Sequence, residues 1–277
     1  MTQRTRSALI PTLLLAAAAS AACFSSETVI RVKPDGSGTI EQTNLANTQL
    51  IGMATSMAQA ATKEAGGEDA DIFTANIEGL FDEAQLREQA ANFGAGVRFV
   101  SSEKLTQGAM QGARAIYAFD DINALKMGSR SENGNRVPAP ELSFAMSKGP
   151  GPRTLTITFP ERASTEGAAE AAPSPVPTTD LPPEALAMVK SMFEGAHVGI
   201  DVEVDGGTIV STDAPKRNGS RVTLLAFDFG QLLSDPSKLS ALQTLKPGVD
   251  FATVQKALAD VPGVTVPAKP KVTIQMR

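Results

Sequence analysis

The chain has 277 residues, a formal net charge of −5, one histidine, one cysteine and no tryptophan. The negative balance argues against a nucleic-acid partner, because phosphate binding needs clustered lysines and arginines. A single histidine and a single cysteine remove nearly all zinc ligand sets and nearly all Ser-His or Cys-His catalytic arrangements. We therefore expect no metal, no cofactor and no nucleic-acid partner.

The first 22 residues have the order of a secretory signal peptide. Two arginines precede an apolar stretch over residues 8–19, and small residues follow over 20–22. The only cysteine, Cys23, comes next, as the lipidated cysteine does in bacterial lipoproteins. We predict cleavage before Cys23 and a diacylglyceryl group on its sulfur. Two alternatives stay open: ordinary secretion, which residues 20–22 would also permit, and a retained membrane helix, although the stretch is shorter than the ~20 residues that a spanning helix needs.

A lipid on Cys23 would fix the location of the protein. Each buried CH₂ contributes roughly 0.8 kcal/mol to membrane affinity, so two or three acyl chains hold firmly. We expect a cell-envelope protein, on the outer membrane if the source has one and otherwise on the outer face of the cell membrane. Phe24, in place of an aspartate after the cysteine, favours transport to the outer membrane.

Elements of both kinds are predicted before residue 163. Helical spacing of apolar residues predicts helices over 46–64 and 82–93, the second ending at Gly94. Alternation of apolar and polar residues, with Gly/Pro turns between, predicts strands over 26–33, 39–43, 97–104, 113–119, 142–147 and 154–159.

Residues 163–182 are rich in alanine, proline, serine and threonine and predict a surface linker. The linker separates an N-terminal α+β region, 23–162, from a C-terminal α+β region, 183–277, and the chain is long enough for one large domain or two smaller ones. Helices are expected over 183–195, 236–245 and 250–260, and strands over 198–204, 209–210, 221–229 and 272–276. The predicted fold class is α+β, with mainly antiparallel sheets covered by a few helices.

Two segments of the chain resemble each other. Residues 116–125 and 224–233 share Ala-Phe-Asp and a downstream leucine, and each follows a predicted helix, a glycine and a strand. One interpretation is a duplicated helix-strand-strand unit with equivalent acids at Asp120 and Asp228, which could pair only if the two units faced each other. The other is convergence of common strand-end residues, in which each acid caps the turn or helix that follows.

Three further features have competing interpretations. His197 follows a predicted helix end and suits a surface position, or a ligand or pH-sensing role. Residues 35–38, Asp-Gly-Ser-Gly, lack the lysine of a P-loop and the spaced acids of a calcium loop, and so predict a hairpin turn. The methionine and alanine stripe over residues 50–61 suits a core or an adaptable apolar groove. None of these predicts a catalytic, cofactor or metal site.

Several features together resemble the bacterial surface lipoproteins with an LppM-type domain. They are the leader with Cys23, a first strand that runs into the turn at 34–38, a methionine-bearing helix and late alternating strands. The resemblance covers the first forty residues and residues 198–233. It implies an α+β domain held at the envelope surface and brings no catalytic motif.

We therefore predict a lipid-anchored envelope protein with a non-enzymatic binding or assembly role. Its expected partners are the membrane, through Cys23, and an envelope protein or an apolar lipid ligand. One rival is a lipid or glycolipid carrier, which an open apolar cavity would favour. The other is a hydrolase that uses carboxylates without histidine, which clustered buried acids in a cleft would favour.

Overall fold

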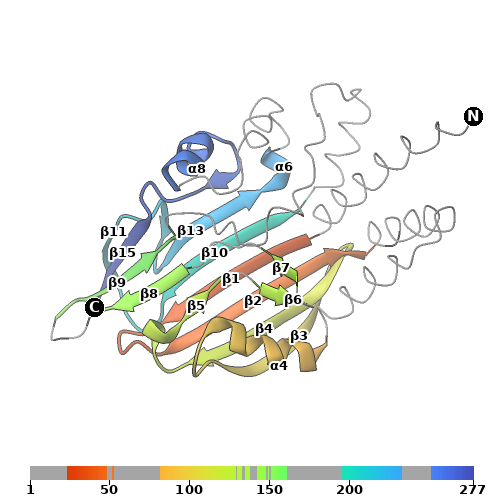
Figure 1. Cartoon of the computed structure of the whole chain (residues 1–277), viewed down its shortest axis with the longest axis horizontal. Helices are drawn as coiled ribbons and strands as arrows, with labels where there is room; N and C mark the ends of the chain where they lie inside the picture. The colour runs from red at the N-terminus through yellow and green to blue at the C-terminus, as the bar shows by residue number, and fades with distance from the viewer. Residues whose placement is uncertain are drawn as a thin grey trace, which may run out of the picture.

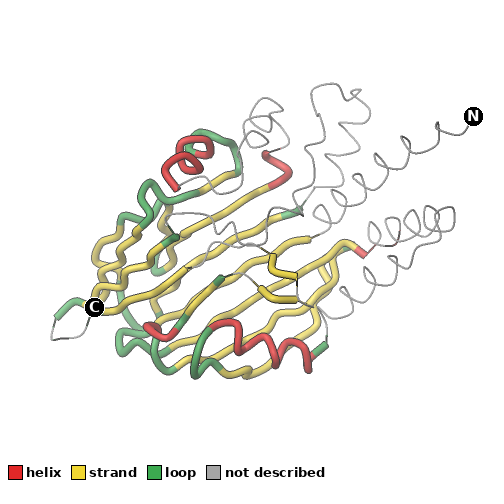
Figure 2. Tube along the Cα trace, viewed as in Figure 1, coloured by secondary structure: helices red, strands yellow, loops and turns green. Residues whose placement is uncertain are grey.

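The computed structural model in Figure 1 describes residues 24–48, 52, 82–128, 130–132, 135–137, 142–147, 149, 151–160, 195–232 and 251–277. The leader, Cys23, the predicted linker 163–182 and the predicted helix over 236–245 lie outside these residues. So do nearly all of the predicted helices over 46–64 and 183–195. Strands predominate in the described part, and the few helices lie beside the sheets (Figure 2). The predicted α+β class with mainly antiparallel sheets is confirmed.

A large sheet is built around one parallel pair of strands. β1 (Phe24–Val32) pairs with β10 (His197–Val204) in parallel, and every other pairing among the described strands is antiparallel. The strand order is β12-β13-β10-β1-β2-β4-β3, with β14 also paired to β13. The remaining bounds are β2 (Gly38–Asn47), β3 (Arg98–Gln107), β4 (Met110–Phe119), β12 (Lys216–Asn218), β13 (Arg221–Asp228) and β14 (Val264–Thr265).

A smaller sheet covers part of one face of the large one. Its order is β11-β15-β9-β8-β5. The bounds are β5 (Lys126–Met127), β8 (Leu142–Met146), β9 (Arg153–Thr158), β11 (Ile209–Thr212) and β15 (Lys271–Met276). A separate hairpin consists of β6 (Arg130–Glu132) and β7 (Asn135–Val137). The strongly alternating segments 142–147 and 154–159 are β8 and β9, as predicted.

Both sheets contain strands from before and after the predicted linker. β1 pairs with β10 in the large sheet, and β9 pairs with β15 in the small one. One buried cluster joins the facing sides, with Ile30 and Val202 from the large sheet and Ile157 and Ile274 from the small sheet all fully buried. Full burial of such a side chain contributes roughly 1.5–3 kcal/mol, so the two regions are held as one folded unit.

Short helices pack at two places along the sheets (Figure 2). The pair α4 (Glu83–Gln89) and η1 (Ala90–Phe93) buries Leu86, Ala90 and Phe93 in the main core, and η2 (Ile122–Ala124) follows β4. α6 (Phe229–Leu232) and α8 (Phe251–Leu258) form a second, smaller cluster with Val261. Among the described helices, none has the length and apolar character needed to cross a bilayer.

The predicted start of the first helix is wrong. The helix expected from residue 46 cannot begin there, because β2 continues through Asn47. Its register with β4 is unbroken from Gly38, opposite Phe119, to Asn47, opposite Met110. Backbone pairing on both sides of β2 therefore outweighs the local helical spacing.

Candidate functional site

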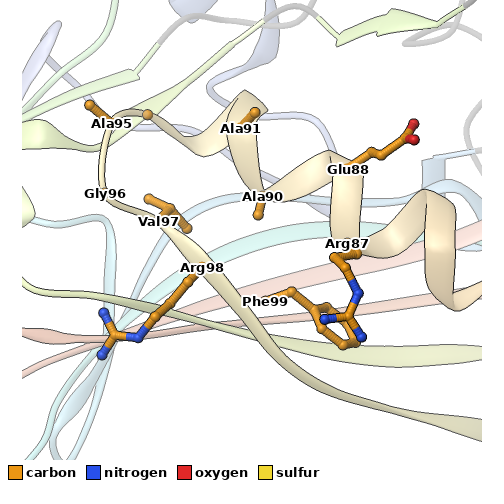
Figure 3. Close-up of a pocket in the computed structure, with 10 residues that line it drawn as sticks. Arg87, Glu88, Ala90, Ala91, Ala95, Gly96, Val97, Arg98 and Phe99 are labelled. Atoms are coloured by element: carbon orange, nitrogen blue, oxygen red, sulfur yellow. The ribbon is translucent and has the colours of Figure 1, made fainter.

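An open hollow lies between the α4–η1 segment and the start of β3 (Figure 3). It has a volume of about 830 Å³, and all ten residues that line it lie between Arg87 and Phe99. Its position beside a helix end and a strand start makes it the candidate site of the described residues.

Half of the residues that line the hollow are alanine or glycine, which leaves its middle unfilled. Alanine or glycine occupies positions 90, 91, 94, 95 and 96, which all line it. Phe93, the one aromatic residue in that run, is buried in the core and does not fill the space. Small residues on the surface therefore leave room for a group supplied by another molecule.

One wall is the helix α4. The Asp82 side chain caps it by accepting a hydrogen bond from Ala84 N at 2.8 Å. Arg87 pairs with Glu83 at 2.7 Å, and its guanidinium lies 4.9 Å from the centre of the Phe99 ring. Figure 3 shows Arg87 over this ring. A cation–π contact at an exposed site contributes about 0.5–1 kcal/mol, so this wall presents an ordered cation and an aromatic face.

The other wall carries Arg98, at the start of β3. Its guanidinium donates to both carboxylate oxygens of Asp120, at 3.0 and 3.1 Å. Arg87 and Arg98 each have an acidic partner, so the cations at the edge are neutralised within the chain. Glu88, an exposed acid, also lines the hollow. The charged residues around the hollow are therefore of both signs and do not favour a free anion.

The floor is fixed by a close backbone approach. Gly94 has φ 116° and ψ 175°, and a Cβ atom there would lie 2.2 Å from the carbonyl oxygen of Ala124. Gly94 also forms a bridge with Leu125. Only glycine fits such a position without displacing the neighbouring turn.

Aromatic packing supports the floor from below. The buried Tyr117 hydroxyl donates to the Leu86 carbonyl oxygen at 3.1 Å, and its ring lies 4.9 Å from that of Phe93 and 5.9 Å from that of Phe99. Such pairs contribute about 0.5–1.5 kcal/mol beyond area burial and help to hold α4, η1 and β3 together beneath the hollow.

A second cluster of charges crosses the opposite, outer face of the large sheet. The outer-face ion pairs join three arginines to five acids across neighbouring strands: Arg31 with Glu41 and Glu203, Arg114 with Glu41 and Glu103, and Arg221 with Glu27 and Asp201. The hydrogen bond from Arg31 to Glu41 raises the pKa of Arg31. Burial lowers the pKa of Arg221, but Asp201 and Glu27 together raise it above its ordinary value.

These acids do not form a hydrolase-like site. Asp201 and Glu41 are the least exposed of them, with side chains 14% and 17% exposed, yet both lie on the face of a sheet and pair with arginine. Among the described residues, no three His, Cys, Asp or Glu side chains gather closely enough to hold a metal ion.

The two acids of the Ala-Phe-Asp segments lie far apart. Asp120 follows β4 and Asp228 ends β13; β2, β1 and β10 lie between these strands, about 19 Å across the sheet. The two acids also lie at opposite ends of the sheet, since Asp228 pairs with His197 at the start of β10. A carboxylate pair of Asp120 and Asp228 is therefore excluded.

The capping interpretation is confirmed for Asp228 and wrong for Asp120, which pairs with Arg98. Asp228 accepts a hydrogen bond from Gln231 N at 3.0 Å, and Asp121, rather than Asp120, caps η2 by accepting from Asn123 N at 2.9 Å. The two units of the possible duplication each contain an antiparallel pair of neighbouring strands, β3 with β4 and β10 with β13. In the second unit, β11 and β12 come between the paired strands in the chain.

The other predicted site residues have varied outcomes. The turn at 35–38 joins β1 to β2, and Asp35 accepts hydrogen bonds from Ser37, which confirms the hairpin. His197 begins β10, half-buried, with its ring against Gly199. Cys23 and the stripe over 50–61 lie outside the described residues, so lipidation and the groove stay predictions. The hollow was not predicted; its sequence signal is the run of small residues after the helix.

No family model and no curated protein matches the chain. Among solved structures, it is similar to the folded domain of the Mycobacterium tuberculosis LppM protein, determined by NMR. The two are 11% identical over 92% of this chain and 90% of that one, with a TM-score of 0.32. The LppM protein shares its name with the family that the leader, Cys23 and the first hairpin of the present chain resemble. A TM-score of 0.32 supports no inference about function, and family membership stays a prediction.

Proposed function

We propose that the protein is a lipid-anchored envelope protein that binds a partner protein through the hollow beside α4. The hollow carries the binding half of this proposal. Its floor is made of small and apolar side chains, and its edges carry Glu88 and two arginines that pair with acids of this chain. A protruding side chain of a partner fits such a depression, as in the pockets that receive anchor residues at protein interfaces.

An open hollow suits a protein partner better than a lipid chain. Its volume of about 830 Å³ lies within the range of small-molecule sites. A carrier, however, encloses most of its ligand, whereas this hollow is wide open and all of its lining comes from one segment. Native mass spectrometry distinguishes the two, because a lipid that stays bound after gentle extraction would favour the carrier.

The anchor half of the proposal depends on Cys23 and the leader before it. Replacing Cys23 with serine should release the protein from membranes and stop incorporation of labelled palmitate. A Cys23→Ser variant that stays membrane-bound would contradict the anchor.

The binding half is tested by filling the hollow. Ala91 lines it and is exposed, so Ala91→Arg should occupy the space without entering the core. Asn92→Arg is the matched control, since Asn92 is exposed on the same short helix but does not line the hollow. A photoreactive residue at position 95 should give a discrete protein adduct in intact cells, which Ala91→Arg abolishes and Asn92→Arg preserves. Adducts that survive Ala91→Arg would contradict the site.

A further inference from the structure

The end of the large sheet at which β1 begins has an unusual composition. We call the anchored rim the residues Phe24, Asn47 and Thr48 together with the β3–β4 turn at 107–110. They are neighbours by strand register: Phe24 pairs with Ala46, and Asn47 pairs with Met110, which in turn pairs with Gln107. In Figure 1, this end of the large sheet lies on the side away from the C-terminus, which follows β15 of the small sheet.

The anchored rim is directly joined to the predicted lipid. Phe24 is the first residue of β1 and follows Cys23 in the chain, so there is no linker between anchor and sheet. Consecutive Cα atoms are 3.8 Å apart, and neighbouring strands are about 4.8 Å apart. The turn on β3, three strands from β1, is therefore within about 15 Å of the anchor laterally.

The anchored rim is also uncharged. The charged residues nearest to it on β1, β3 and β4 are Glu27, Lys104 and Arg114, each at least three positions from the strand end at the rim. At about 3.3 Å per residue, these strands carry a neutral band about 10 Å deep. That depth is comparable with the roughly 5–10 Å to which amphipathic helices enter the boundary between headgroups and acyl chains.

The opposite end of the same strands is charged. Lys33, Asp35, Arg98 and Asp120 lie where β1, β3 and β4 meet the far turns. On the other side of β1, the described strand β13 ends at the rim end with Asp228, whose carboxylate accepts hydrogen bonds from Gln231 of α6. Moving charges toward a bilayer is costly, whereas amide, hydroxyl and small side chains can exchange water for lipid headgroups.

The β3–β4 turn is shaped to project from the rim. Gly108 has φ 61°, and a Cβ atom there would meet nothing within 4 Å, so the tip stands in open space. Thr48 N donates to the Ala109 carbonyl oxygen at 3.2 Å, which fixes the turn against the end of β2.

We propose that the anchored rim rests on the headgroup layer of the bilayer that holds the Cys23 lipid, with the β3–β4 turn in contact with it. This inference rests on the proposed lipid anchor. It adds an orientation: the far end of the sheet and the hollow point away from the membrane.

The test uses the full-length lipidated protein in vesicles of phosphatidylcholine and phosphatidylglycerol. A fluorophore is attached in separate variants at Ala109→Cys and at Lys33→Cys, an exposed residue at the far end; the acylated Cys23 sulfur cannot react. Brominated phosphatidylcholine should quench the label at position 109 and leave the label at position 33 unaffected. A Gln107→Cys variant repeats the measurement on β3 in case a label at the tip disturbs the turn.

Flotation of the vesicles separates the two proposals. If the protein floats and the labels at 109 and 107 are quenched no more than the label at 33, the orientation is wrong while the anchor stands. If these labels are shielded from aqueous iodide but not quenched by bromolipid, protein rather than lipid covers the rim, and the inference is again overturned. If the wild-type protein does not float, the anchor and the orientation fail together.

Discussion

A single methyl group at Gly94 tests the floor of the hollow. Gly94 lies in a backbone region almost restricted to glycine, and a Cβ atom there would be 2.2 Å from the Ala124 carbonyl oxygen. Gly94→Ala must therefore strain the backbone and also displace the turn that follows β4. Its bridge with Leu125 would be lost or weakened.

The expected loss can be worked from these two effects. Backbone held in such a region costs about 1–3 kcal/mol, and a lost backbone hydrogen bond about 1 kcal/mol more. We expect Gly94→Ala to lower the free energy of unfolding by roughly 2–4 kcal/mol. Gly96 provides a matched control, because it has φ 81° but nothing within 4 Å of an added Cβ. Gly96→Ala should cost only the left-handed strain, about 1–2 kcal/mol.

Equilibrium urea unfolding of the two variants and the parent protein measures both losses. Both variants place a side chain at positive φ, and only Gly94→Ala adds the contact with Ala124, so the difference between them contains that contact together with the greater strain of the Gly94 backbone. If Gly94→Ala destabilises the protein no more than Gly96→Ala does, the close approach of the two segments is refuted. The floor of the hollow would then be looser than the structure shows.

Three further predictions concern other parts of the fold. Glu41 pairs with two arginines, and its side chain is only 17% exposed. Glu41→Gln should therefore lower the free energy of unfolding by about 1–2 kcal/mol. In the same urea assay, Glu83→Gln removes a pair whose side chains are both 63% exposed and should change the free energy of unfolding by less than about 0.5 kcal/mol. Hydrogen bonds from Ser37 hold the pKa of Asp35 below its ordinary 3.8, so Ser37→Ala should raise that pKa in an NMR titration. Because the folded-state pKa is depressed, Asp35 stabilises the fold above pH 3.8, and this contribution is lost as the pH falls through the folded value. Ser37→Ala removes the hydroxyl bond and keeps the backbone N–H bond, so a titration unchanged by this substitution would refute the role of the hydroxyl. Lys104 places a charge on the exposed strand β3, at an edge of the large sheet. Such a charge opposes pairing of the edge with another chain, so Lys104→Val should promote self-association, measured by light scattering. A variant that stays monomeric would contradict this role of Lys104.

Local patterns predicted most of the strands. β8 and β9 fall within two residues of the segments 142–147 and 154–159, because period-two alternation and a Gly/Pro turn are encoded within the hairpin itself. The turn at 35–38 was predictable for the same reason. Its Asp-Gly-Ser-Gly sequence makes its own hydrogen bonds, whatever the rest of the chain does.

The helix expected from residue 46 shows where local patterns fail. Apolar spacing after Ala46 is helical, but Ala46 and Asn47 pair with Gln111 and Met110, more than sixty positions away. The number of hydrogen bonds that a segment gains from a distant strand is not visible in its own sequence. The parallel pairing of β1 with β10 was hidden for the same reason.

The site was harder to predict than the fold. The Ala-Gly run after the helix indicated only a helix stop, since nothing local says that β3 would leave the space beside it unfilled. The Ala-Phe-Asp pattern indicates Asp120 as a candidate acid, but its contact with Arg98 at the edge of the hollow depends on the pairing of β3 with β4. Chemistry-bearing residue types were visible in the sequence, but their neighbours were not.

Strand direction explains why the hollow lies away from the predicted anchor. β1 runs away from the anchored rim, its neighbour β2 runs back to it, and β4, which pairs with β2, runs away from it again. Because β3 is antiparallel to β4, β3 must begin at the far end. The helix that precedes β3 has to deliver the chain there, so a hollow between the helix and β3 can form only at that end. From Arg98 to Gln107 the strand covers about 30 Å. We therefore expect Ala91→Arg to abolish the partner adduct while the protein floats with vesicles as the parent does; loss of flotation would show that the two ends are not independent.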